Sequence, residues 1–137
     1  MTKEFLYEFI SKHKYGVLSS VTPDNKPEAA YVGFAVTPDL KLIFDTVSTS
    51  RKYNNLVNNS SIAFVIGWNN EQTVKNEGTA KIPSPDEIDE LLETYFKVFP
   101  DGKFRKENWK DIAYFCVEPK WIRYSDFNIH LIEEIKF

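Results

Sequence analysis

The first segment of the chain, residues 2–14, carries apolar side chains at helical spacing. Phe5, Leu6, Phe9 and Ile10 fall on one stripe of such a helix. Gly16 follows at a position where a helix-ending residue is expected. The pattern therefore predicts an amphipathic helix that packs one face on the core.

The pattern then changes to short apolar runs separated by turns. The first three runs are bounded by turns that contain proline and aspartate, which predicts a three-strand meander. Later runs predict further strands, and Gly78 within one of them predicts a bulge or a sharp bend. The predicted strands are residues 16–22, 28–37, 41–46, 61–68, 71–82, 111–119, 120–127 and 128–137.

Three further helices interrupt this series of strands. One begins at Arg51, and both its inward face and its left-handed end can be predicted from the sequence. A second begins with Ser84 as N-cap and Glu87 as its capping-box partner. A third, short helix is expected at residues 104–109. In the first of these helices Tyr53, Leu56 and Val57 should face inward, and Asn58 and Asn59 should end it.

Many short strands with few helices between them favour an antiparallel β-barrel flanked by helices. The sequence shows no internal repeat, low-complexity tract or linker, so we expect a single domain over residues 1–137. We expect a mainly β, α+β fold of about six to eight antiparallel strands.

Composition and charge limit the possible partners. Of the 137 residues, 42% are hydrophobic and 27% charged, as in a globular protein. The net charge of −3 argues against nucleic acid, which binds basic surfaces. No apolar run approaches the roughly 20 residues of a membrane helix, and the N-terminus does not resemble a signal peptide. We therefore expect a cytoplasmic protein with no membrane and no nucleic-acid partner.

The residues that could carry metal or thiol chemistry are few and scattered. Cys116 lies in an apolar run, where a buried structural thiol is the simplest interpretation. His13 is interpreted as a helix-end or surface residue, and His130 as a structural residue in a strand. No carboxylate or thiol stands at ligand spacing from either histidine, so we expect no metal site.

The stretch between the third strand and the helix at Arg51 is the best candidate site. Thr46 ends the strand, Ser50 is the expected N-cap, and Arg51 and Lys52 open the helix. Hydroxyls, free backbone N–H groups and two cations suit a phosphate monoester. Two solvated cations beside a capping serine are the commoner arrangement, so the residues alone leave both interpretations open.

The order of these pieces resembles the pyridoxamine 5′-phosphate oxidase-like family of FMN-binding split barrels. The resemblance rests on "FDTVSTSRKYNNL" followed by "SIAFVIGWNNEQTVKNEGTAKI". It implies that Arg51 and Lys52 hold the FMN phosphate, with Ser50 and Thr46 as hydroxyl contacts. It also implies that Gln72 contacts the flavin ring across a homodimer interface. Other residues placed near the ring by the resemblance are Tyr31, Val32, Gly33 and Trp68.

The resemblance also has departures that narrow the expected activity. Residues 29–37 contain no cation, and the C-terminal segment lacks the basic, histidine-bearing substrate motif of true pyridoxamine phosphate oxidases. The chain is instead similar to short relatives described as general stress or nitroimidazole-resistance-like flavoproteins. We expect an FMN-dependent oxidoreductase that acts on a small organic substrate, with no catalytic residue assigned. The alternatives are a non-catalytic flavin or haem carrier or sensor, and a reductase that uses F420.

Overall fold

The computed structural model describes all residues from 1 to 137 as one eight-stranded antiparallel sheet with flanking helices. The elements are α1 (Lys3–Ser11), β1 (Tyr15–Val21), β2 (Pro27–Gly33), β3 (Ala35–Val36), β4 (Leu42–Val47), α2 (Arg51–Asn58), β5 (Ser61–Ile66), the 3-10 turn η1 (Asn69–Glu71), β6 (Gln72–Lys81), α3 (Ile88–Val98), α4 (Gly102–Asn108), β7 (Ile112–Asp126) and β8 (Leu131–Lys136).

The order of the strands explains why the sheet closes only partly. It is β2-β1-β5-β6-β7-β4-β3, with β8 paired to β7. Strands β2 and β3 are consecutive in the chain, yet they lie at opposite ends of this order, on either side of Phe34. The sheet therefore curls until its two edges meet at one stretch of chain. This confirms the predicted mainly β, antiparallel split barrel.

The separation of β2 from β3 at Phe34 corrects the prediction of a single strand over residues 28–37. Strand β2 pairs with β1, whereas β3 pairs with β4, so the predicted single strand is two strands. Because β2 and β4 are not neighbours in the sheet, the predicted three-strand meander is wrong. Strand β2 is left with one edge that no strand of this chain covers.

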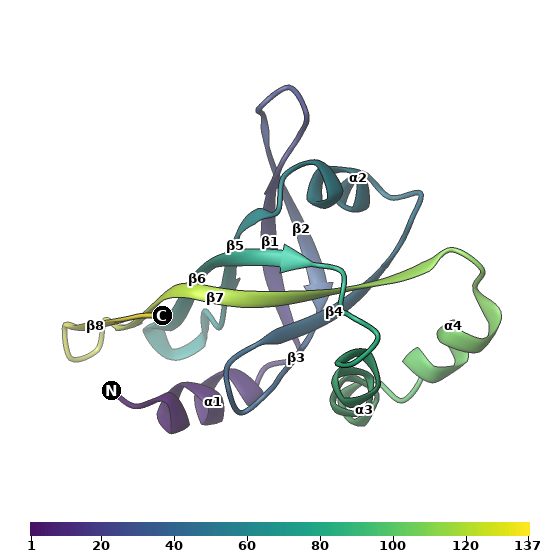
Figure 1. Cartoon of the computed structure of the whole chain (residues 1–137). Coiled ribbons are helices and arrows are strands. Elements are labelled where there is room, and N and C mark those ends of the chain that lie inside the picture. The colour runs from purple at the N-terminus through teal and green to yellow at the C-terminus, as the bar shows by residue number, and fades with distance from the viewer.

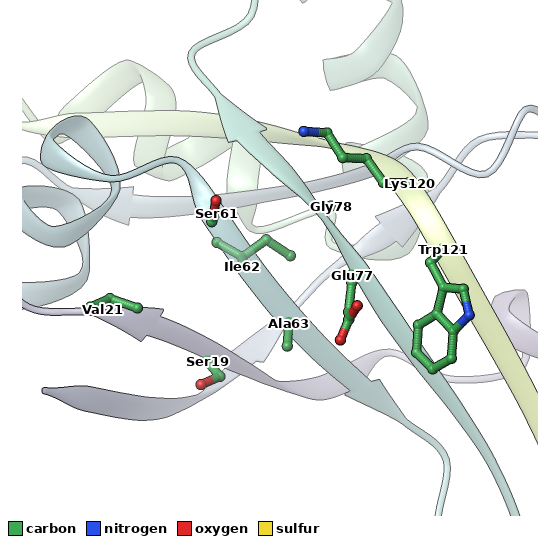
Figure 2. Close-up of a pocket in the computed structure, with 9 residues that line it drawn as sticks. All are labelled: Ser19, Val21, Ser61, Ile62, Ala63, Glu77, Gly78, Lys120 and Trp121. Atoms are coloured by element: carbon green, nitrogen blue, oxygen red, sulfur yellow. The ribbon is translucent and has the colours of Figure 1, made fainter. Parts of the chain in front are cut away.

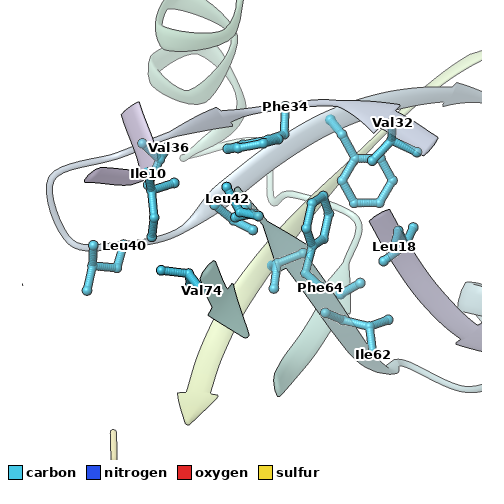
Figure 3. Packing of buried hydrophobic residues seen from close by; sticks show 14 of the residues in the cluster. Ile10, Leu18, Val32, Phe34, Val36, Leu40, Leu42, Ile62, Phe64 and Val74 are labelled. Carbon is cyan, nitrogen blue, oxygen red and sulfur yellow. The ribbon is translucent and has the colours of Figure 1, made fainter. Parts of the chain in front are cut away.

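The main core fills the inside of the curled sheet. It is built from inward-facing residues of the strands together with Leu6 and Ile10 of α1. Figure 3 shows the rings of Phe34 and Phe64 packed among aliphatic side chains, and the two ring centroids lie 5.4 Å apart. A smaller cluster forms between β4, β7 and α3, and it includes Cys116, which is buried as expected.

The helices cover the two ends of the curled sheet. Figure 1 shows α2 near the β1–β2 hairpin, with α1 and α3 on the opposite side. Helix α1 ends at Ser11, earlier than expected, and Gly16 lies inside β1 instead of ending the helix. A Cβ at Gly16 would lie 2.4 Å from Phe64 Cε1, so this glycine makes room for a core ring. None of the helices has the length and apolar composition that crossing a membrane requires.

Helix α2 begins as predicted and ends differently. Ser50 is its N-cap and accepts a hydrogen bond from the Tyr53 N–H at 3.1 Å. Its last residue is Asn58, and the C-cap Asn59 is extended at φ −147°, so the predicted left-handed end is wrong. Val57 is exposed, and the buried residue beside Leu56 is Asn55, whose polarity hid it from the apolar pattern.

The helices that follow β6 shift slightly from the prediction. Glu87 accepts from the Ser84 N–H at 3.0 Å, which is half of the expected capping box. The helix proper begins at Ile88, with a turn in between. Helix α4 begins at Gly102, two residues earlier than expected.

The C-terminal strands differ most from the prediction. Residues 112–126 form one strand, β7, which pairs with β4, β6 and β8. A bulge interrupts its pairing with β6: Glu77 lies opposite Trp121 and Gly78 opposite Pro119, which leaves Lys120 without a partner. The bulge predicted at Gly78 is therefore confirmed. His130 lies in the exposed turn before β8 at φ 51°, so its predicted place in a strand is wrong.

Candidate functional site

The four residues predicted to bind phosphate lie together at the start of α2. Ser50 Oγ and Thr46 Oγ1 are 2.9 Å apart, and Lys52 Nζ donates to Thr46 Oγ1 at 3.3 Å. The strand end supplies Thr46, and the helix supplies the other two groups. No acidic residue lies in the first turn of α2 itself, so the helix contributes no negative charge of its own beside its positive end.

Arg51 takes part in a different contact. Its Nη2 atom lies 2.6 Å from Glu28 Oε2, an acid on β2. The Arg51 side chain is 80% exposed, whereas that of Glu28 is 16% exposed. Asn55 Nδ2 donates to Glu28 Oε1 at 3.2 Å and to Ser20 Oγ at 3.1 Å. The Arg51 guanidinium is thus accessible, and it is held by the Glu28 carboxylate of β2, which is itself fixed by Asn55.

The predicted ring-binding segment lies on the uncovered edge strand β2. Tyr31 is exposed and stacks on Tyr15, with ring centroids 5.0 Å apart. Val32 points into the core, so only its backbone is available to a ligand. A Cβ on Gly33 would lie 2.7 Å from Phe99 Cζ, so this glycine leaves room for the ring that follows α3. Tyr31 follows Glu28 by three residues, which is about 10 Å along a strand.

Tyr31 and Trp68 are brought together by the fold. They line a hollow of about 300 Å³ beside the turn between α1 and β1, together with Tyr15, Lys12, His13 and Lys14. Burial, and then the charge of Lys12, lower the pKa of His13, which leaves that ring neutral at pH 7. This hollow lies at the end of β2 opposite the phosphate candidates.

Gln72 is not near the phosphate candidates within one chain. Its Nε2 donates to Tyr124 OH at 3.1 Å and to Asp126 Oδ2 at 3.2 Å. The Gln72 amide is the main cause that lowers the pKa of the Asp126 carboxyl. Strand β6 is three strands away from β2 in the sheet, or roughly 14 Å at the usual strand spacing. In this chain, Gln72 therefore fixes the end of β7.

A second hollow of about 400 Å³ lies on the outer face of the sheet (Figure 2). Small side chains of β1 and β5 form its base, and Trp121 and Lys120 of β7 stand on one side. None of the residues predicted for the cofactor lines it.

An ion pair between α4 and β4, which no sequence pattern predicts, lies next to the site. Arg105 of α4 donates from Nε to Asp45 Oδ2 at 2.9 Å, and its Nη2 lies 2.9 Å from the same oxygen. Asp45 directly precedes Thr46, so this contact fixes the end of β4 that presents the Thr46 hydroxyl. Burial raises the pKa of the neighbouring Tyr95 well above its usual range, so its hydroxyl stays neutral.

Solved structures with the same fold are numerous and distant in sequence. A haem-binding protein from Mycobacterium smegmatis aligns with a TM-score of 0.84 at 13% identity, over 99% of this chain and 58% of that one. General Stress Protein 26 from Bacillus anthracis aligns with a TM-score of 0.75 at 21% identity, over 100% of both chains. HutZ, a haem storage protein from Vibrio cholerae, aligns with a TM-score of 0.72 at 17% identity, over 87% of this chain and 91% of that one.

At these identities the structures establish the fold alone. This chain spans only 58% of the length of the mycobacterial protein. No curated protein matches the sequence. The family model described as pyridoxamine 5′-phosphate oxidase matches residues 2–126, which is most of the chain. The chain therefore belongs to the pyridoxamine 5′-phosphate oxidase family.

Proposed function

We propose that this chain binds FMN and acts as an FMN-dependent oxidoreductase on a small organic substrate. The observation that carries the proposal is the convergence of Thr46, Ser50 and Lys52 within 3.3 Å contacts at the N-terminus of α2. Arg51 stands beside them with an accessible guanidinium. Membership of a family named for a phosphate-ester oxidase supports the proposal.

The donor set fits the phosphate end of FMN. A phosphate monoester accepts hydrogen bonds on all its terminal oxygens, and hydroxyl, ammonium and guanidinium groups are its usual partners. The Ser50 and Thr46 hydroxyls now bond to each other, and either can rotate toward a ligand. The positive end of the helix dipole adds to the attraction.

The ring end of the site requires a second copy of the chain. The uncovered edge of β2 offers backbone groups to the polar edge of a ring, but its outer side is open to solvent. Tyr31 and Trp68 are exposed aromatic side chains at that end. Gln72 is hydrogen-bonded to Tyr124 and Asp126 within its own chain and contacts none of the residues proposed to bind the phosphate. A homodimer with the cofactor sites at its interface would cover these surfaces and bring such groups together.

When bound, the flavin would supply the redox chemistry. The chain's own residues would bind the phosphate, align the ring along β2 and exclude water through the second copy. We assign no acid or base.

The test is flavin binding by paired charge-reversal variants. Arg51→Glu with Lys52→Glu should weaken FMN binding by at least about 100-fold, because two charge-assisted contacts become repulsive. Lys103→Glu with Lys106→Glu reverses two exposed charges on α4 and should leave binding unchanged. Fluorescence quenching of added FMN measures both. Full FMN affinity in the Arg51/Lys52 variant would refute the phosphate assignment.

Haem binding is the second candidate, because two structural neighbours are described as haem proteins. In this chain His130 is exposed in the turn before β8, and His13 packs against Phe9. Haem titration of the wild type and of His130→Ala tests this candidate: unchanged uptake by the variant would exclude His130 as the axial ligand.

Extraction and mass measurement of the native cofactor separates FMN, haem and F420. A flavin that NADH, NADPH and candidate substrates all fail to reduce would favour a non-catalytic carrier or sensor over an oxidoreductase.

A further inference from the structure

The ion pair between Glu28 and Arg51 distinguishes the two cations at the start of α2. Lys52 contacts a hydroxyl, whereas Arg51 contacts a carboxylate at 2.6 Å. Every other group in this cluster is neutral or positive. Glu28 therefore reduces the positive charge that an incoming anion meets.

Of the two members of this pair, Glu28 is the fixed one. Its side chain is largely buried on the inward face of β2 and accepts a hydrogen bond from Asn55. Asn55 is itself buried, and it is held by Ser20 on β1. Arg51 has no other ion pair and an exposed side chain, so the arginine can move while the acid stays.

We propose that Glu28 is a specificity-determining residue of the anion site. It holds Arg51 when the site is empty, and a phosphate group must share or displace this contact. Glu28 thereby weakens the binding of phosphate-bearing ligands and leaves ligands without phosphate unaffected. This inference rests on the proposed function, since it assigns Arg51 to a phosphate.

The charge of Glu28 is separable from its structural contact. Glu28→Gln keeps an oxygen that can accept from Asn55, and it removes both the negative charge and the acceptor that faces Arg51. Arg51 is solvent-exposed, and at a dielectric close to that of water a carboxylate about 4 Å from a bound phosphate costs roughly a tenfold loss of affinity. Asp24 is the matched control, because it is an exposed acid whose nearest cation is Lys26 at 3.5 Å and which also feels the charge of Arg51.

The experiment compares FMN, riboflavin and inorganic phosphate as probes. Glu28→Gln should bind FMN about tenfold more tightly than the wild type does, with riboflavin affinity unchanged. Asp24→Asn should change FMN affinity by less than about twofold. Equal gains for FMN and riboflavin, or equal gains in both variants, would overturn the proposal, because the effect would not act through the phosphate.

Inorganic phosphate separates failure of this inference from failure of the proposed function. Its binding is followed by the NMR shift of the Arg51 Nε–H group. If no variant binds FMN, the proposed function fails, and tighter phosphate binding at Arg51 in Glu28→Gln still supports the role of Glu28. If the wild type binds FMN, and Glu28→Gln binds FMN and inorganic phosphate with wild-type affinity, the inference fails and the proposed function stands.

Discussion

Replacing Arg105 by alanine tests the ion pair that holds α4 against the end of β4. Two nitrogens of Arg105 lie 2.9 Å from Asp45 Oδ2, and the side chains of Arg105 and Asp45 are 16% and 15% exposed. Breaking a fully buried pair by removing one partner costs about 3–5 kcal/mol, and breaking an exposed pair about 0.2–1 kcal/mol. Because both side chains are mostly but not fully buried, we expect a value between these two ranges: Arg105→Ala should lower the free energy of unfolding by about 2–3 kcal/mol.

The same arginine provides an internal control. Arg105 Nη1 also lies 2.8 Å from Asp101 Oδ2, but the Asp101 side chain is 74% exposed. Asp101→Asn should therefore cost less than about 0.5 kcal/mol. Urea unfolding of Asp45→Asn, Arg105→Ala and the double variant gives the coupling energy, which we expect to be about 1–2 kcal/mol. A coupling near zero, or an Asp101→Asn cost equal to that of Asp45→Asn, would refute the reasoning.

Three further predictions concern single side chains. Ser50→Ala removes the N-cap acceptor of α2 and should cost about 1 kcal/mol in urea unfolding; an unchanged midpoint would contradict this. A Cβ at Gly78 would lie 2.3 Å from the Glu118 carbonyl oxygen, so Gly78→Ala should cost about 2–3 kcal/mol, seen as a lower melting temperature. Burial raises the pKa of Cys116 from 9.0 to about 11, so its thiol should stay unreactive toward disulfide reagents at pH 8 until the protein unfolds. The stability that this neutral thiol contributes is complete below pH 9.0 and is lost as pH rises through about 11; rapid native-state labelling at pH 8 would show the burial to be wrong.

Most elements were predictable because each carries its own local pattern. The stripe of α1, the cap of α2 and the bulge at Gly78 depend on neighbouring residues and were found. Strand β7 was divided in two because Pro119 breaks a strand pattern. In the structure Pro119 lies at the bulge, where the ladder is already interrupted and the missing N–H costs little.

Tertiary packing decided what local patterns could not. Leu40 adopts φ 69°, which is unfavourable for a bulky side chain, yet it is completely buried in the core. Burial outweighs the local cost there, and no spacing rule anticipates it. Asn58 and Asn59, in contrast, belong to a residue type that readily adopts the left-handed conformation. Here Asn58 is helical and Asn59 is extended, because only a short link separates α2 from β5.

The candidate site was also predictable where it depends on neighbouring residues, and not where it depends on contacts between distant parts of the chain. Thr46, Ser50 and Lys52 lie within one strand-to-helix turn, so sequence spacing alone places them together. Glu28 and Arg51 are far apart in the chain, and only the pairing of β2 with β1 brings Glu28 to the start of α2. The Gln72 contacts depend in the same way on the register between β6 and β7.

The position of β7 in the sheet has a consequence for how the chain folds during synthesis. Strands β4, β6 and β8 all pair with β7, and β4 must wait for a partner about 70 residues later in the chain, as the pairing of Leu42 with Val117 and of Val47 with Ile112 shows. Until β7 has left the ribosome, β4 and β6 each expose an unpaired edge. Cooperative closure of the sheet is therefore a late event, and the nascent chain is most prone to association just before it.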